Sequence, residues 1–577
     1  MITTRILNCN IKRTALLVAT FILFTVKTYS QNRLWATYYG GSQSDWDYTA
    51  DVITDATGNV YICGSTDSQN NIAYNGFQNT YGGIWDAYLV KFDANGNRIW
   101  ATYYGGTQSE YPSSLAIDAN GNIYMAGYTS GSTIGIAYNG FQNTFGGGNS
   151  DNFLVKFDAS GNRIWATYYG GAGDEQSNCS VAVDATGNVY LGGGTTSSNS
   201  ITTVGGYQNT NAGNGDAYLI KFDSNGNRIW GTYFGGPSGE GFWGITTDPF
   251  GNIYTSGYTQ SATGIANNGF QNTFGGVADA YINKYNTAGN LIWATYYGGA
   301  GTDFVYTLAA DSNTVVFCGR ADSISTNIAS ANGAQINYQG GYNDGFVVKL
   351  DTAGNRIWAT YYGGNGDDYP SDLALEKTTG NIYLCGTTTS ANNIANNGYC
   401  DSLALGADHF LVKLNAAGQS VWATYYNSSS TANNYPLSFF AGPQCCVDTS
   451  AHVYLLGGTD NLTGIATNGF QNTYGGSYSD AYLVKFGNLN TSGIEENTQP
   501  INAVNAYPNP FNDNVKITSS STILNIEVLN SLGQVVFARN YINNVTTNIQ
   551  VNNLAKGIYL MQIHTSKGIQ LKKIVKE

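Results

Sequence analysis

Acidic residues recur near the start of a repeated unit along this chain, and aromatic residues stand beside them. Carboxylates supply oxygen ligands for a cation, and aromatic rings stack against the faces of sugar rings. If the equivalent loops converge on one axis, these groups form a partial ring at the mouth of a central channel. The candidate ligand-binding residues are Asp45, Trp46, Asp47, Glu110, Tyr111, Asp174, Glu175, Glu240, Trp243, Asp303, Asp367, Asp368 and Tyr369.

Two other interpretations of the same residues stay open. In one, the acids are solvated loop residues that keep a chain with only 11% charged residues in solution. In the other, paired carboxyls about 5 to 10 Å apart serve as acid and base in a polysaccharide-active hydrolase or lyase. The scarcity of His, Lys and Arg outside the repeated positions counts against catalysis, so we expect no catalytic residue.

The remaining motifs predict neither a metal centre nor a cofactor. The three histidines (His409, His452 and His564) have no partner at metal-ligand spacing, and no GxSxG, HExxH, Walker-type or CxxC motif is present. Turns of the DANGN type offer Asp and Asn oxygens, so calcium is an alternative there. They lack the density of acids found in dedicated calcium loops.

The cysteines of the repeated region fall into two groups. Those at one repeat position are expected to be small buried residues in different sheets, too far apart to bridge. They are Cys63, Cys318 and Cys385. The least regular copies hold three more, among which one disulfide is an open alternative: Cys400, Cys445 and Cys446.

The distribution of positive charge excludes nucleic acid as a partner. The net charge is −13, and nucleic-acid binding requires clustered cations that displace phosphate counterions. Most cations of the repeated region instead recur at fixed positions of the unit, which predicts a scaffold role with stems packed on aromatic rings. These are Lys91, Lys156, Lys221, Lys284, Lys349, Lys413 and Lys485, and Arg33, Arg98, Arg163, Arg228 and Arg356.

Internal repetition predicts the elements that position these groups. Segments of the WATYYGG type begin at Trp35, Trp100, Trp165, Trp230, Trp293, Trp358 and Trp422, and segments of the DAYLVKF type begin at Asp86, Asp151, Asp216, Asp279, Asp344, Asp408 and Asp480. Each unit contains four strand-like segments joined by Asp/Asn/Gly turns, which predicts a four-stranded antiparallel meander. Strands such as WATYY are apolar on both faces, so neighbouring sheets must cover both sides.

This pattern predicts an all-β fold with a seven-bladed β-propeller over residues 31–487. The chain opens with a fourth strand that has no first three before it, and the last unit lacks its fourth strand. The N-terminal strand is therefore expected to complete the last blade and close the ring, which removes open sheet edges. The predicted blades are approximately 42–106, 107–171, 172–236, 237–299, 300–364, 365–428, and 429–487 together with 33–41.

Three motifs of this repeat carry a resemblance to a known family: GNVYICGST, NGFQNTYGG followed by DAYLVKFD, and RIWATYYGG. Through them, residues 33–487 resemble the bacterial seven-bladed β-propeller repeat family. The resemblance implies the fold and no single activity, because propellers host both enzymes and binding proteins.

The two ends of the chain predict export. Residues 1–30 have the features of a secretory signal peptide, with a positively charged start and an apolar core too short to span a membrane. A polar linker is expected over 488–503. Residues 504–577 contain alternating runs that predict a small β-sandwich of about six or seven short strands.

The last segment is similar to the type A C-terminal sorting domain of the type IX secretion system. The motifs YPNPF, LNSLGQVV, KGIYLMQI and KKIVKE carry the resemblance. It implies that the chain passes the inner membrane by its signal peptide and that the secretion machinery then recognises this domain at the outer membrane. The sorting-motif residues are Tyr507, Pro508, Asn509, Pro510, Phe511, Gly557, Tyr559, Lys573 and Lys576.

Together these features predict an exported, cell-surface or secreted module with a binding or structural role and no catalytic activity. The expected partners are the type IX secretion machinery and a glycan or surface protein, with no transmembrane segment in the mature chain. A polysaccharide-active hydrolase or lyase and a passive scaffold in a surface assembly are the alternatives.

Overall fold

The computed structural model describes residues 32–43, 49–176, 178–325, 328–404, 406–426, 442–476, 479–487, 504–530, 534–540, 542–566 and 568–577. The chain divides after Asn488 into two compact units. The predicted signal peptide and linker lie outside the described residues, as do Asp45, Trp46 and Asp47. All regular elements in the described ranges are β-strands, and no helix there is long and apolar enough to cross a membrane.

The larger unit contains seven four-stranded antiparallel sheets within the described residues. Three of them are β2 (Thr49–Thr54), β3 (Val60–Thr66), β4 (Asp86–Phe92) and β5 (Arg98–Tyr104); β6 (Glu110–Ile117), β7 (Ile123–Thr129), β8 (Asp151–Phe157) and β9 (Arg163–Tyr169); and β10 (Ser180–Val183), β11 (Val189–Thr195), β12 (Asp216–Phe222) and β13 (Arg228–Phe234).

Three more sheets follow the same order of strands. They are β14 (Glu240–Thr247), β15 (Ile253–Thr259), β16 (Asp279–Tyr285) and β17 (Leu291–Tyr297); β18 (Asp303–Ala310), β19 (Thr314–Asp322), β20 (Asn343–Asp351) and β21 (Arg356–Tyr362); and β22 (Asp368–Glu376), β23 (Asn381–Thr388), β24 (Asp408–Leu414) and β25 (Ser420–Tyr426).

The seventh sheet joins the two ends of the repeated region. It consists of β26 (Gln444–Val447), β27 (Val453–Thr459), β28 (Asp480–Gly487) and β1 (Asn32–Tyr39). In the ladder between β1 and β28, Trp35 lies opposite Lys485 and Tyr39 opposite Ala481. The predicted pairing of the N-terminal strand with the last DAYLVKF segment is therefore confirmed.

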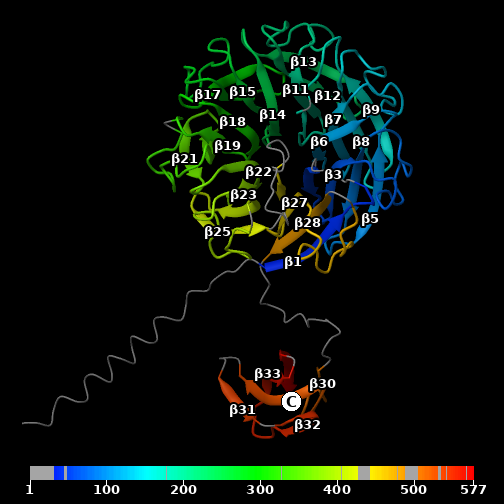
Figure 1. The fold of residues 1–577 in the computed structure, drawn as a ribbon, viewed down its shortest axis with the longest axis vertical. Helices are drawn as coiled ribbons and strands as arrows, with labels where there is room; N and C mark the ends of the chain where they lie inside the picture. Colours follow the sequence, from blue (N-terminus) through cyan, green and yellow to red (C-terminus); the bar gives the residue numbers. More distant parts are fainter. Residues whose placement is uncertain are drawn as a thin grey trace, which may run out of the picture. The chain divides into compact units, whose positions relative to one another are not determined.

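The first strands of the seven sheets face one another. Each contacts the first strand of the next sheet, from β2 to β6 and onward to β26, and β26 contacts β2. Figure 1 shows the sheets radiating from a common centre, with β6, β14 and β22 close to it. The inner strands therefore surround a shared space.

Turns of one design connect paired strands within the sheets. Between β4 and β5, the backbone N–H groups of Asn95 and Asn97 both donate to Asp93 Oδ1 at 2.9 Å, and Asn97 Nδ2 donates to Asp93 Oδ2 at 2.8 Å. Gly96 adopts a φ of 85°, which disfavours any side chain. The carboxylate oxygens that calcium would use are thus hydrogen-bonded within the turn itself.

The repeated cations pack on aromatic rings, as the sequence predicted, and they also hold neighbouring sheets together. The Arg98 guanidinium lies 4.4 Å from the ring centre of Phe470 in the preceding sheet and 5.0 Å from that of Tyr74. The Lys91 ammonium lies 5.0 Å from the Tyr61 ring centre and donates to the carbonyl of Ala159 in the next sheet at 3.3 Å. Cation–π contacts and hydrogen bonds between sheets explain why these positions repeat.

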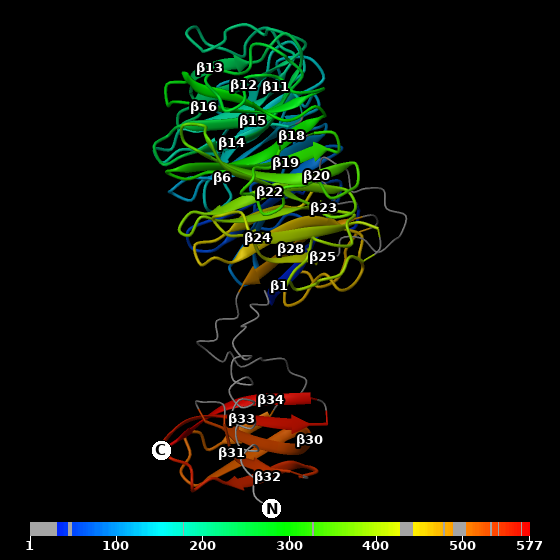
Figure 2. The same ribbon diagram turned by 90° about the vertical axis from the view of Figure 1, so that its left-hand side faces the viewer.

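The smaller unit is one antiparallel sheet built around a long strand, as Figure 2 shows. β30 (Asn514–Leu529) pairs with β29 (Val504–Tyr507) and β32 (Asn544–Gln550) mainly through its first half, and with β31 (Val535–Arg539) and β33 (Gly557–Thr565) through its second. β34 (Gly568–Lys576) pairs with β33. The sequence predicted separate short strands here, whereas the Ser-rich stretch in the middle of β30 contains no Gly or Pro that would end the strand.

Candidate functional site

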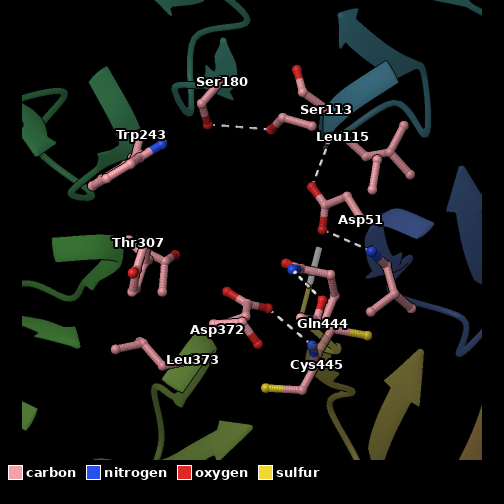
Figure 3. A pocket seen from close by; sticks show the side chains of 18 of the residues that line it. Asp51, Ser113, Leu115, Ser180, Trp243, Thr307, Asp372, Leu373, Gln444 and Cys445 are labelled. Atoms are coloured by element: carbon pink, nitrogen blue, oxygen red, sulfur yellow. Dashed lines mark hydrogen bonds between the residues drawn. The ribbon is translucent and has the colours of Figure 1, made fainter. Parts of the chain in front are cut away.

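A cavity of about 1100 Å³ lies between the inner strands of the larger unit. Residues of β2, β6, β10, β14, β18, β22 and β26, the first strand of each sheet, line it. We refer to this cavity as the channel. Figure 3 shows part of its lining from close by.

Five of the predicted site acids do not line the channel. They are buried, with at most 2% of their surface exposed: Glu110, Glu175, Glu240, Asp303 and Asp368. Glu110 shows how they are held, since it accepts hydrogen bonds from the Gly106 backbone N–H at 2.7 Å and from Thr129 Oγ1 at 2.6 Å. The sequence predicted that these five carboxylates lie at the mouth of the channel. Each carboxyl is instead buried inside the protein, near the start of its sheet.

Each of these acids faces a second buried acid from the preceding sheet. Burial, with a smaller contribution from the nearby Glu110 carboxylate, raises the pKa of Asp86 to about 6. A Cβ added at Gly105 would lie 2.6 Å from Asp86 Cγ and 2.8 Å from Glu110 Oε2. The first glycine of the pair in the WATYYGG motif is therefore required by the two carboxyls that lie against it.

The other predicted residues divide between the channel and the surface. Tyr111, Trp243, Asp367 and Tyr369 line the channel. Asp174 is partly exposed and accepts a hydrogen bond from the Asn149 backbone N–H at 2.6 Å, but it does not line the channel.

Aromatic side chains concentrate on the first half of several inner strands and on the neighbouring β7. We call Tyr111, Tyr128, Trp243, Tyr306 and Tyr369 the aromatic rim. The Trp243 ring lies 4.9 Å from that of Tyr306, and the Tyr111 and Tyr128 rings stack with centres 5.0 Å apart. These are flat apolar surfaces of the kind that pack against sugar rings.

Further along the strands, a set of mostly polar side chains crosses the channel wall. Sequence reasoning missed this set, which occupies one equivalent position in all seven sheets, and we call it the polar belt. Its members are Asp51, Ser114, Ser180, Gly244, Thr307, Asp372 and Gln444.

Several belt side chains accept a hydrogen bond from the inner strand of the next sheet. The Leu115 N–H donates to Asp51 Oδ2 at 2.7 Å, and the Cys445 N–H donates to Asp372 Oδ2 at 2.9 Å. The inner strands have one edge without a ladder partner, and their N–H groups need acceptors. The belt therefore ties the inner edges together (Figure 3).

Two belt members are aspartates that lie close enough to interact. Burial raises the pKa of Asp51 to about 8, with a contribution from the Asp372 charge, and burial raises the pKa of Asp372 to about 7. Among the described residues, no Lys or Arg forms an ion pair with either carboxyl. Both carboxyls are therefore harder to ionise than an exposed aspartate, and no ion pair in the described part of the chain offsets their charge once they ionise.

A local irregularity exposes the channel-lining side chains. Five inner strands contain a register shift just before the belt position, which places residues such as Ser113, Trp243 and Tyr306 out of the regular alternation. Bulges of this kind re-aim side chains near binding sites. The one signal in the sequence was departure from the repeat, because the belt position holds five different residue types.

Two histidines have internal partners, in agreement with the predicted structural role. His409 is buried, its Nδ1 lies 2.6 Å from Tyr482 Oη, and burial lowers its pKa to about 3. His452 Nδ1 lies 2.9 Å from Asp448 Oδ2 in a turn. All cysteines of the described residues are free.

The predicted sorting residues of the smaller unit come together at one edge. Asn509 Nδ2 donates to the Lys573 carbonyl at 2.8 Å, and the Val575 N–H donates to Asn509 Oδ1 at 2.8 Å. Phe511 is buried and bridges to Lys576, whose ammonium lies 5.6 Å from the Phe511 ring centre. The YPNPF and KKIVKE motifs therefore pack against each other.

Comparison with family models finds one match in each part of the chain. Residues 505–577 match the secretion system C-terminal sorting domain. Residues 99–134 match the beta-propeller repeat. A sorting domain of this kind implies contact with the secretion machinery and export to the cell surface or secretion.

Two curated relatives match part of the chain. An uncharacterized WD repeat-containing protein of Acanthamoeba polyphaga mimivirus is 26% identical over 426 residues, which is 60% of this chain and 30% of that protein. The regulatory protein FlaEY of Caulobacter vibrioides is 27% identical over 354 residues, 57% of this chain and 35% of that protein. The matches therefore span about a third of each relative's length.

Similar solved structures include PorZ, an essential surface component of the type IX secretion system of Porphyromonas gingivalis. PorZ is 12% identical with a TM-score of 0.35, over 94% of this chain and 60% of that chain. A polysaccharide lyase, an ulvan lyase, is 11% identical with a TM-score of 0.36, over 74% of this chain and 93% of that chain. Similarity at this level carries no argument about function.

Proposed function

We propose that this protein is an exported, non-catalytic binding module whose channel takes a carbohydrate. In this proposal, residues 31–487 form a seven-bladed β-propeller closed by β1, and residues 504–577 deliver it to the cell surface or the medium through the type IX machinery. A signal peptide over residues 1–30 starts the export.

One observation carries the proposal: the aromatic rim and the polar belt line the same channel. Sugars offer apolar ring faces beside many hydroxyl groups, so a site for them combines flat aromatic surfaces with hydrogen-bonding side chains. Trp243 and Tyr369 supply such surfaces, and Ser180 and Gln444 supply polar groups further along the wall. The volume of about 1100 Å³ is ample for a short oligosaccharide.

The test is a glycan array probed with the full chain, followed by calorimetry with the glycans that bind. Trp243→Ala and Tyr369→Ala are each expected to weaken binding by about tenfold, since a stacked aromatic contributes roughly 1 kcal/mol beyond its area. Phe250→Ala is the matched control, because Phe250 is an exposed aromatic in the turn before β15 and does not line the channel.

Other outcomes assign other functions. If bound polysaccharide is shortened over time, the protein is a hydrolase or lyase. If no glycan binds and the rim variants behave as the wild type in every assay, the binding proposal fails and the passive scaffold is favoured.

A further inference from the structure

A buried cluster of two thiols and one carboxyl lies at the channel wall. One ligand atom from each of Asp372, Cys385 and Cys445 lies within 4.8 Å of the other two, and all three side chains are buried. Asp372 and Cys385 stand opposite each other in the ladder between β22 and β23. Cys445 comes from β26 of the next sheet and its backbone N–H donates to Asp372 (Figure 3).

The ring contains a second corner of almost the same construction. Asp51 stands opposite Cys63 in the ladder between β2 and β3, as Asp372 stands opposite Cys385. The backbone N–H of Leu115 donates to Asp51 at 2.7 Å, in the place where Cys445 donates to Asp372. The two corners differ in one side chain, a leucine in one and a cysteine in the other.

This comparison separates the structural role of the corner from any further role. The backbone hydrogen bond to the aspartate and the small thiol opposite it are met equally well in both corners. Packing favours an aliphatic residue at the position of Cys445, since the repeat places Leu115, Val181, Ile245 and Leu308 there. Cys445 adds a third donor atom that the fold does not require.

The donor set and its electrostatics favour a thiophilic cation. Within the described part of the chain, Asp372 has no cationic partner, and a buried carboxylate without one is costly. Two thiolates and one carboxylate suit zinc, which takes sulfur and oxygen ligands in a four-coordinate arrangement. Because Asp372 and Cys445 also line the channel, solvent can supply the fourth ligand.

We propose that Asp372, Cys385 and Cys445 bind a zinc ion that joins the sheets β22–β25 and β26–β1. Each thiol gives up its proton on binding. The cation therefore competes with protons for the two sulfurs, and its affinity falls as the pH is lowered. The proposal goes beyond the proposed function and does not require that the channel binds carbohydrate.

The experiment measures zinc in the full chain after equilibration with Zn²⁺ and removal of the free ion. One equivalent per chain is expected for the wild type, and Co²⁺ in place of Zn²⁺ is expected to give a thiolate-to-cobalt charge-transfer band. Cys445→Leu is expected to lose the bound zinc and the cobalt charge-transfer band. It is expected to stay folded, because it reproduces the Leu115 corner. Cys318→Ala is the matched control, since Cys318 is also buried and occupies the repeat position of Cys385 without belonging to the cluster.

A gain-of-site variant tests the same geometry in reverse. Leu115→Cys completes the cluster at the Asp51 corner and is expected to bind a second equivalent. The proposal is overturned if the folded wild type retains no zinc, if Cys445→Leu retains it, or if peptides from the unreduced protein show Cys385 joined to Cys445.

Discussion

The frame of the larger unit and the wall of its channel follow opposite rules. The frame consists of positions that keep one residue type in most sheets, such as the tryptophan and lysine that bond to the next sheet. The wall includes the polar belt, where seven equivalent positions hold Asp, Ser, Ser, Gly, Thr, Asp and Gln. Repetition within the chain thus marks the residues that hold the fold, and departure from it marks the residues that can face a ligand.

The largest effect is expected from a change in the frame at Gly105. Valine at this position would force a Cβ to within 2.6 Å of Asp86 Cγ, between two buried carboxyls. We expect Gly105→Val to lower the free energy of unfolding by about 4 kcal/mol or more, measured by denaturant titration. Gly239→Ala is the control, because its added Cβ meets nothing closer than 3.8 Å. Similar stability of the two variants would contradict the rule that the repeated frame positions hold the fold.

A smaller loss is expected from Arg98→Met, which removes a frame cation. The variant keeps much of the stem but loses the contacts with Tyr74 and Phe470 and the hydrogen bond to the Asn71 carbonyl at 2.9 Å. We expect a loss of about 1 kcal/mol in the free energy of unfolding. The equivalent positions in two other sheets hold Leu291 and Ser420, which limits the effect of one substitution. An unchanged denaturation midpoint would show that the Arg98 contacts do not stabilise the frame.

The buried acids predict a pH dependence for the frame. Burial raises the pKa of Asp303 to about 7, above the value of about 4 for an unfolded chain. The stability due to the protonated carboxyl is therefore fully present below pH ~4 and is lost as the pH rises to about 7. Between pH 5 and pH 8, the melting temperature of Asp303→Asn is expected to fall by about 1–3 °C less than that of the wild type. An equal fall in the melting temperature of both proteins would show that the Asp303 carboxyl does not cause this pH dependence.

The smallest effect is expected at the channel wall. Ser180→Ala removes one hydroxyl of the polar belt, which contacts Ser114 Oγ at 3.3 Å. The expected change in the free energy of unfolding lies within about 0.5 kcal/mol. A loss as large as that for Arg98→Met would show that the belt also belongs to the frame.

Much of the fold could be predicted because the seven copies of the repeated unit can be compared with one another. The WATYYGG and DAYLVKF markers placed two strands of every sheet, and the unmatched first and last segments predicted the pairing of Trp35 with β28. These inferences depend on backbone pairing and turn chemistry, which short sequence motifs specify locally.

The site was harder to predict because side-chain direction depends on register. Glu110 and Tyr111 are neighbours in sequence, yet the first is buried between sheets and the second lines the channel. Asp51 and Asp372 lie inside strands and belong to sheets that are far apart in sequence. Only the bulges of the inner strands and the order of the sheets bring these two carboxyls together.

The ladder between β1 and β28 has a consequence for how the chain unfolds. It joins residues as distant as Trp35 and Lys485, which stand 450 positions apart. Bringing two such segments together costs about 5 kcal/mol of chain entropy, which is recovered only when the last sheet is complete. Without this ladder the sheet of β26, β27 and β28 has three strands and β28 has an open edge, so we expect unfolding to begin at this junction.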